Sequence, residues 1–524
     1  MPTVQRLVPR PRARVSSPGT PRTCDRPRRL GPLLTAGLWA WALALAPAAA
    51  PAAEPQPVEL ARQTLRARLA DPRQRPAVLG ALGTTEDANL LPLFDAAARW
   101  GRPATARFAV SVLAQTPGDR ARELLRERVS QADDPAIAAH ALGQLLEAEA
   151  VDAEFLRPLL KSDSEAIRLL AARGLVRAGQ TDGVAEVLKG LAGSDEQATE
   201  LMARLTLLKL GAEEQRAVID KKIAGDASAG LKSLLLGQVA VEKIAAAAPL
   251  ALRIAQDPNN PFSLQVVAWR AVATADPRGK DRLFRAIVDS EGLLKRLGLT
   301  RVMALAEDNQ RYLEALKADE GVAGALARLE LARPEGGQPL SESAVACLDY
   351  SHPVVVGHLL TRAREDVDAN VARGAAYVPA LAKLLHAANR ESRKASYAGQ
   401  AASLLADIGT RSSLTELHKA LTGGNQQVQR AALAGLTATR NAVAPRLAKP
   451  LLESPYAELY ATAALALGRA GESAARGRLL EILRHPGRFP PHICPLAGWY
   501  LLKLQGADAA AEARKLGSVL SEKP

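Results

Sequence analysis

The chain has 524 residues, more than one hydrophobic core usually organises, so it either holds several domains or is a solenoid that lengthens without widening its core. Ala and Leu dominate and only 3% of residues are aromatic, which favours packed helices over a sandwich or barrel. The net charge of +13 does not indicate nucleic-acid binding, because residues 1–53 hold eight Arg and one acidic residue, Asp25, leaving a mild excess for the rest.

The N-terminal segment reads as an export signal. Residues 1–30 are rich in Arg and Pro, residues 31–46 are uncharged and apolar, and residues 47–53 are small residues and proline. This is the order of a secretory signal peptide, and the apolar run is shorter than the ~20 residues that usually span a bilayer. We therefore expect residues 1–53 to be a leader, cleaved after Ala48 or Ala52, and residues 54–58 to be a linker. The expected location is periplasmic or extracellular; an uncleaved leader that anchors the chain in a membrane is the alternative.

Residues 163–194 contain the clearest repeating unit of the chain. Asp163 or Ser164 is suited to cap a first helix, Gly179 to end it, and Thr181 or Asp182 to cap a second helix. Apolar residues recur in both segments at the spacing that places them on one helix face. They are Ile167, Leu170, Ala171, Leu175 and Val176 in the first segment, and Val184, Val187, Leu188 and Leu191 in the second. The unit is therefore predicted to be a helical hairpin.

The same pattern recurs along the chain as a small residue followed eight positions later by glycine. The pairs are Ala171 and Gly179, Ala203 and Gly211, Ala401 and Gly409, Ala463 and Gly471, and Gly498 and Gly506. The unit near Ala431 has Thr439 in place of glycine, and Ala109, Ala139 and Ala268 extend the phase. A period near 32 residues is the signature of stacked helical hairpins, which bury their apolar faces against one another.

This string resembles the bacterial HEAT-like repeats also seen in phycobilin-lyase HEAT proteins, whose unit reads Asp-x-x-x-Val-Arg-x-x-Ala-Ala-x-x-Leu followed by glycine. The clearest matches are residues 164–179 and 454–471, and the resemblance covers most of residues 73–515. It implies an all-α fold, an α-solenoid in which antiparallel helical hairpins stack into a superhelix, here over residues 59–524. It implies little about function, because such repeats serve many unrelated tasks.

Two segments interrupt the pattern. Residues 320–340 end in a run of prolines and glycines, which makes them a candidate seam between two arms, with an ordinary inter-repeat insertion as the alternative. Residues 485–495 hold several prolines and are predicted to form a rigid connection before the last hairpin. We expect the first hairpins, near residues 60–100, and the last, near 496–520, to cap the two ends. The second helices of the hairpins are expected to form the concave wall.

The chain contains no GK[ST] phosphate loop, HExxH, GxSxG or CxxCH motif, so no enzyme activity and no cofactor are expected. His485, His492 and Cys494 form the closest His/Cys group, but their spacing matches no zinc finger and a fourth ligand is missing, so no metal is expected.

Three further sets of residues are interpreted as structural rather than functional. Cys347 could form a nucleophile–base pair with His352 or His358, but nothing in the sequence supplies the oxyanion hole that such a site needs. We therefore expect Cys347 to be a packing residue rather than a nucleophile. The basic residues Arg390, Arg393 and Lys394 are read as a solvated turn. The three cysteines, Cys24, Cys347 and Cys494, are too few for a disulfide framework, although one bridge between the last two remains an alternative.

The leading functional hypothesis is an exported, non-enzymatic HEAT-repeat scaffold that binds a protein or peptide on its concave face. One alternative is a lyase-like or chaperone-like HEAT protein that holds a small molecule or chromophore in a polar pocket. Another is a nucleic-acid-binding HEAT-like protein with clustered Lys and Arg on that face. We expect no nucleic-acid partner and no membrane span in the mature chain; the sequence leaves the oligomeric state open.

Overall fold

The computed structural model describes residues 56–225, 227–333, 340, 352–387, 392–423 and 425–521, without the side chains of residues 392–396. Within these ranges every regular element is a helix. The chain divides into residues 1–55 and the unit Gln56–Pro524, and all that follows concerns the second unit. The expected export leader lies outside the described residues, as do residues 334–339 of the candidate seam. The first helix begins at Pro57, so two residues of the expected linker are helical.

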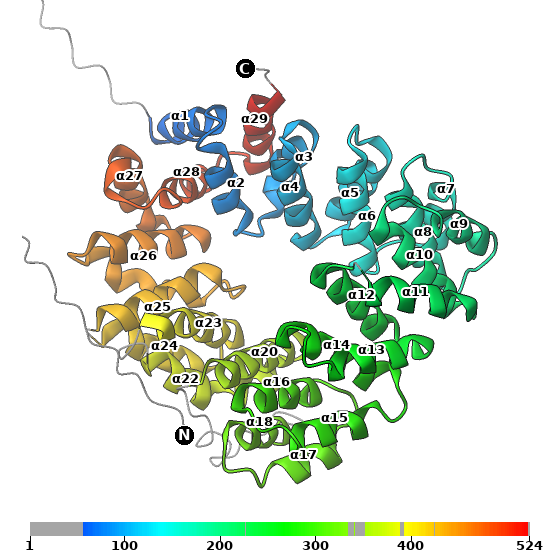
Figure 1. Cartoon of the computed structure of the whole chain (residues 1–524). Helices are drawn as coiled ribbons and strands as arrows, with labels where there is room; N and C mark the ends of the chain where they lie inside the picture. The colour runs from blue at the N-terminus through cyan, green and yellow to red at the C-terminus, as the bar shows by residue number, and fades with distance from the viewer. Residues whose placement is uncertain are drawn as a thin grey trace, which may run out of the picture. The chain divides into compact units, whose positions relative to one another are not determined.

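The helices form two rows, and each helix of one row packs between helices of the other (Figure 1). Successive helices of the inner row contact one another along the whole unit. The inner helices are α2 (Arg75–Gly83), α4 (Pro103–Gln115), α6 (Pro135–Glu147), α8 (Glu165–Arg177), α10 (Gln197–Lys209), α12 (Ala229–Glu242), α14 (Phe262–Ala275), α16 (Leu293–Ala304), α18 (Val322–Leu331), α20 (Pro353–Ala369), α23 (Ser392–Ile408), α25 (Gln426–Ala438), α26 (Ala457–Arg469) and α28 (Ile493–Leu504).

Helices of the outer row contact one another only weakly between α5 and α17, as expected where a curved stack has its larger circumference. The outer helices are α1 (Pro57–Ala70), α3 (Leu91–Trp100), α5 (Asp119–Gln131), α7 (Ala153–Leu159), α9 (Val184–Leu191), α11 (Glu214–Ala224), α13 (Ala248–Gln256), α15 (Gly279–Val288), α17 (Gln310–Leu316), α21 (Val371–Ala375), α22 (Val378–His386), α24 (Arg411–Thr422), the 3-10 helix η4 (Ala444–Glu453), α27 (Arg476–Arg484) and α29 (Ala509–Ser521).

This arrangement confirms the all-α solenoid of HEAT-like hairpins but corrects which helices face inward. In the predicted unit, α8 is the first helix and α9 the second, and the inner row contains α8. The prediction that the second helices form the concave wall is therefore wrong. The physical reason lies in the small residues: inner helices approach one another most closely, and they carry the recurrent alanines.

The predicted hairpin over residues 163–194 forms with one change at its turn. Ser164 caps α8, since its hydroxyl accepts a hydrogen bond from the Ile167 N–H at 3.5 Å. The helix ends at Arg177, and Gly179 terminates it as expected, in the turn with φ +72°. Helix α9 is capped by neither Thr181 nor Asp182; its N-cap is Gly183, also at φ +72° and without a side-chain hydrogen bond. The turn therefore depends on two left-handed glycines rather than on a polar cap.

The turns that follow many of the inner helices show a second version of the repeat. All five glycines that the sequence pattern placed there, Gly179, Gly211, Gly409, Gly471 and Gly506, have positive φ. At four other turns of this kind a charged residue takes the left-handed conformation instead: Glu86, Glu149, Lys243 and Asp308, with φ between 46° and 51°. A side chain makes this conformation costly, by about 1–2 kcal/mol per residue. The repeat therefore also occurs where the turn after the inner helix has no glycine.

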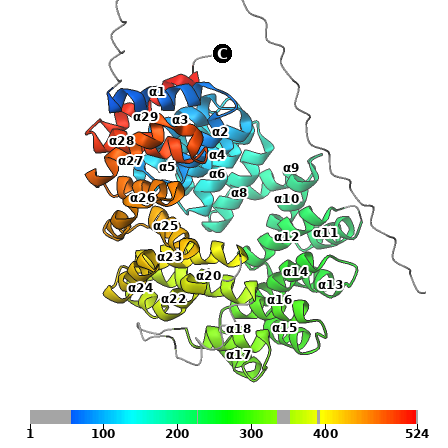
Figure 2. The same ribbon diagram turned by 90° about the vertical axis from the view of Figure 1, so that its left-hand side faces the viewer.

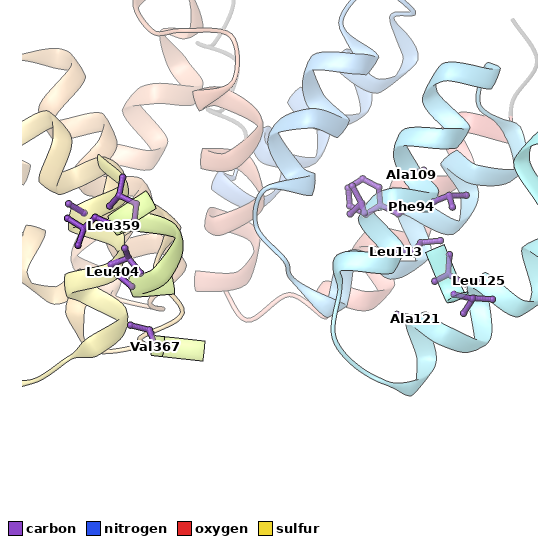
Figure 3. Close-up of a cluster of buried hydrophobic side chains, with 14 of the residues drawn as sticks. Phe94, Ala109, Leu113, Ala121, Leu125, Leu359, Val367 and Leu404 are labelled. Carbon is purple, nitrogen blue, oxygen red and sulfur yellow. The ribbon is translucent and has the colours of Figure 1, made fainter. Parts of the chain in front are cut away.

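The core is a continuous layer of Ala and Leu side chains between the two rows. Figure 3 shows Phe94 of α3, Leu113 of α4 and Leu125 of α5 packed in succession. The recurrent small residues are mostly fully buried, but Ala139 is only partly so. The fully buried alanine of α6 is Ala141, which corrects the predicted phase there by two residues.

Helices α18 and α20 flank the undescribed part of the candidate seam and contact each other directly. Their contact is polar and largely buried. The Arg362 guanidinium pairs with Glu330 at 2.6 Å, and Arg333 pairs with Asp366 at 2.8 Å. Burial and the hydrogen bond to Asp366 raise the pKa of Tyr377 far above its ordinary value. The inner row therefore continues across this position.

The two ends of the unit pack against each other, so the expectation that the first and last hairpins are caps is wrong. Helix α28 contacts α1 and α2, and α29 contacts α1 and α3, which closes the inner row into a ring of helices. Both views show α1, α28 and α29 together (Figures 1 and 2). Two glycines allow the close approach: a Cβ on Gly498 would lie 3.2 Å from Leu65, and one on Gly517 would lie 3.0 Å from Ala96.

Buried polar contacts complete this junction between the terminal helices. The carboxylate of Asp87 accepts hydrogen bonds from the fully buried Trp499 indole at 3.0 Å and from the Lys503 ammonium at 2.8 Å. Glu512, 3% exposed, accepts two bonds from the Arg62 guanidinium at 2.8 and 2.9 Å. The hydrogen bond from Arg62 is the main cause that lowers the pKa of Glu512. The polar groups of each end therefore have their hydrogen-bond partners on the other end.

Candidate binding face on the inner row

The inner face of α6, α8, α10 and α12 contains an open groove of about 560 Å³, which we call the first groove. Its centre is Glu242, whose carboxylate pairs with Arg173 at 3.4 Å, Arg177 at 3.2 Å and Lys209 at 2.5 Å. Burial alone would raise the pKa of Glu242, but the hydrogen bonds and charges of these cations lower it overall. Each of these three cations thus already contacts a carboxylate within the chain.

A second groove of about 550 Å³ adjoins the first and is lined by α12, α14, α16 and the turns that follow them. Lys243 lines both grooves. Its ammonium pairs with Glu307 at 3.0 Å, while Lys280 donates to the Glu307 backbone carbonyl at 3.0 Å. These contacts satisfy the two lysines of the second groove.

The two arginines of the second groove are different. Neither Arg270 of α14 nor Arg301 of α16 has an ion pair within the described residues, and the Arg301 Nε is buried without a hydrogen-bond partner. Four cations and one carboxylate, Glu307, line the groove. Arg270 is exposed and Arg301 is partly buried, so both guanidinium groups are accessible to a ligand from the groove. The buried Nε of Arg301 lacks an acceptor, and a buried polar atom of this kind usually has one.

Exposed apolar side chains gather around the same helices. The large apolar residues that are exposed on α12, α14 and α16, or directly after α16, are Leu234, Val241, Phe262, Leu293, Leu294 and Leu305. Val241 lines the first groove at 59% exposure, and Leu305 lines the second at 45%. Exposed apolar side chains that gather in this way usually mark an interaction surface.

Three of the four strained turns, all except the one at Glu86, also lie here. Glu149 and Lys243 line the first groove, and Asp308 follows Glu307 at the edge of the second. At these turns a charged side chain is held in a conformation that glycine adopts without cost, and such strain is typical of functional sites.

A third groove, of about 650 Å³, lies between α20, α23 and α25 and provides an internal contrast. It too is lined by an inner-face arginine, Arg364, but that guanidinium pairs with Asp407 of α23 at 2.6 Å. Asp407 is buried and also accepts from the Thr439 hydroxyl at 2.7 Å. Inner-face arginines therefore find acidic partners in the first and third grooves but not in the second.

The sequence candidates for metal binding do not form a site. Cys494 is a fully buried free thiol that contacts the carbonyl oxygens of Ile482 at 4.0 Å and Pro486 at 3.9 Å. Burial raises the pKa of this thiol. The side chains of His485 and His492 are exposed, and no three His, Cys, Asp or Glu residues of the described part gather around a common point.

The other residues that the sequence singled out are also placed, or lie beyond the described ranges. His352 caps α20 by accepting the Val354 N–H at 3.4 Å. His358 is fully buried, with its Nε2 2.9 Å from Glu330. Cys347 and Arg390 lie outside the described residues, and the side chains of Arg393 and Lys394 are not described. The sequence analysis missed Arg270 and Arg301, because a sequence does not show which arginines lack an acidic partner or share a groove.

No helix of the described part has the length and apolar character needed to cross a membrane. No protein-family model matches the chain, and no curated protein matches it.

Among solved structures, the chain is similar to the karyopherin Kap121p bound to the extreme C-terminus of the phosphatase Cdc14p, with 12% identity and a TM-score of 0.33. That match covers 89% of this chain and 55% of the karyopherin, so the chain spans about half the length of that protein. Human deoxyhypusine hydroxylase is similar over 68% of this chain and 97% of its own, with 17% identity and a TM-score of 0.20. The assignment of the fold rests on the helices described above.

Proposed function

We propose that the protein is an exported, non-enzymatic scaffold that binds a protein or peptide segment on the inner face from α6 to α16. The observation that carries this proposal is the second groove, where two arginines without an acidic partner among the described residues lie beside the exposed Leu305 and partly buried valines. Protein interfaces combine arginine and large apolar residues in this way. A contiguous face on consecutive repeats is also where solenoids usually bind extended partners.

The two alternatives have less support. The first and second grooves are open between neighbouring helices, whereas a chromophore site needs a pocket that encloses most of its ligand. Nucleic-acid binding needs many free cations along a track, and on the inner face Arg173, Lys209 and Arg364 are already paired with carboxylates.

Site-specific photo-crosslinking tests the scaffold proposal. A photoreactive residue is placed at Val241 or Leu305, and in a control at Val288, an exposed aliphatic residue of the outer helix α15. After irradiation of the cell envelope, we expect a discrete protein adduct from positions 241 and 305 and none from position 288. Equal adducts from all three positions would exclude the inner face as binding site, and adducts of small molecules alone would favour the chromophore alternative.

Export is a separate part of the proposal and rests on the order of segments in residues 1–53. Intact mass spectrometry of the protein from an envelope fraction is expected to show a chain that begins at Ala49 or Ala53. A full-length chain in the membrane fraction would favour an anchor, and a full-length chain in the cytoplasm would contradict export.

A further inference from the structure

The second groove differs from the first and third grooves in that its arginines have no carboxylate partner among the described residues. In the first groove Arg173 on α8 is paired with Glu242 on α12, and in the third Arg364 on α20 is paired with Asp407 on α23. In both cases the carboxylate comes from another inner helix. In the second groove, α14 and α16 each supply an arginine, and the one carboxylate that lines it, Glu307, is already paired with Lys243.

The walls around these arginines are aliphatic. The groove is lined beside the guanidinium groups by Val266 and Val267 of α14, Val302 of α16, and Leu305 directly after α16. Leu305 is exposed and the two α14 valines are partly buried. A ligand that fits must therefore carry negative charge directly next to apolar groups, which an inorganic anion or a nucleic-acid backbone does not.

We propose that the second groove binds an acidic peptide segment, in which Asp or Glu side chains pair with Arg270 and Arg301 while adjacent aliphatic side chains pack on Val266, Val302 and Leu305. The partner's carboxylates replace the acid that the chain itself supplies in the first and third grooves. Arginine suits this task because its planar guanidinium binds a carboxylate through two parallel hydrogen bonds. This proposal rests on the proposed scaffold function and names the chemistry of the partner segment.

The test uses the purified protein immobilised on a resin and two pooled libraries of eight-residue peptides. In the first library two central positions are Asp or Glu and their neighbours are Leu, Ile, Val or Phe. In the second, Asn or Gln replaces the acids at the same positions. Retained peptides are identified by mass spectrometry at low and high salt. We expect at least tenfold stronger retention of the acidic library at low salt, and a loss of this preference at high salt.

Variants assign the binding to the groove. Arg270→Gln and Arg301→Gln are each expected to reduce retention of acidic peptides about tenfold or more, because each removes a charge-assisted hydrogen bond. The matched control is Arg285→Gln on the neighbouring outer helix α15, which removes an equal charge from an exposed side chain and should change retention less than twofold. Circular dichroism checks that all three variants keep their helical content.

Three results would overturn the proposal: equal retention of both libraries, retention that Arg270→Gln and Arg301→Gln leave unchanged, and complete displacement of the acidic peptides by equimolar inorganic phosphate. None of these bears on the crosslinks from Val241 and Leu305. A discrete protein adduct there, together with a negative peptide result, would keep the scaffold function and reject only the acidic segment.

Discussion

The junction between the terminal helices and the inner face from α12 to α16 are two surfaces built from the same repeat, and they differ in what their polar groups contact. At the junction, Arg62 and Lys503 each pair with a carboxylate from the other end of the unit. On the α12–α16 face, Arg270 and Arg301 have no such partner among the described residues.

Their apolar groups differ in the same way. Trp499 is fully buried at the junction, whereas Leu294 at the start of α16 is 69% exposed. The same protein thus has one surface whose partner is present, the junction, and one whose partner is missing, the α12–α16 face. The contrast indicates that exposure on the α12–α16 face is not a general property of the repeat, since the same architecture buries such groups where a partner surface is present.

Replacement of the junction tryptophan should have the largest effect. Trp499→Ala removes a fully buried ring and leaves Asp87 without one donor, so we expect the junction to lose about 3–5 kcal/mol. Leu294→Ala on the exposed face should cost less than about 0.5 kcal/mol. Hydrogen exchange is the measurement: faster exchange in α1–α3, α28 and α29 is expected, with α12–α16 unchanged. Uniformly faster exchange would mean that the junction is not a separate unit of stability.

Glu512→Gln should have a smaller effect on the same junction. It weakens the double hydrogen bond from Arg62, which is itself partly exposed, and we expect a loss of about 1–2 kcal/mol. Glu59 also pairs with Arg62, at 3.6 Å, but on the surface. Glu59→Gln should therefore change the melting temperature very little. Equal shifts for the two variants would argue that Arg62 contributes only through a surface charge.

Acid should loosen the junction before the α12–α16 face. The pKa of Glu512 is lowered chiefly by its hydrogen bond from Arg62. For Asp87 burial opposes ionisation, but contacts with Lys503 and Trp499 lower its pKa overall. A lowered folded-state pKa adds stability that is complete above the ordinary carboxyl value and is lost as the pH falls through the folded value. Hydrogen exchange between pH 6 and pH 3 should thus show α28 and α29 opening first, and Glu512→Gln should reduce this pH dependence.

The smallest predicted effects concern the turns. Glu149 has φ +51° and Gly211 has φ +97°, at equivalent turns after α6 and α10. Glu149→Gly should raise the free energy of unfolding by about 0.5–1 kcal/mol, because it removes left-handed strain from an exposed residue. Gly211→Ala should lower it by about 1 kcal/mol or more for the opposite reason. Thermal unfolding measures both, and effects of the same sign would contradict the equivalence of the two turns.

The repeat could be predicted from sequence because each hairpin is specified locally. Ala171 and Gly179 lie on one helix and its turn, and their eight-residue spacing directly reflects the helical period. The turns at Glu149 and Lys243 were missed, because a charged residue in a left-handed conformation leaves no signal in a single sequence. The inward helix was assigned wrongly because both helices of a hairpin are apolar on one face.

The candidate site and the junction could not be predicted from the sequence, because both depend on contacts between residues far apart in the chain. Asp87 and Trp499 are separated by 412 residues, and they meet only because small rotations between successive repeats add up around the unit. No single residue or short motif determines the total rotation around the unit. Arg270 and Arg301 stand out only by comparison with Arg173 and Arg364, whose acidic partners lie on other helices.

Closure also constrains how this gene can change in length. Open solenoids gain or lose repeats by duplication and deletion, since a new repeat only displaces one end. Here an additional repeat would turn the C-terminal helices past the N-terminal ones and separate Arg62 from Glu512 and Asp87 from Lys503. Descendants of this chain should therefore diverge by substitution and by insertions in loops, while the number of hairpins stays fixed.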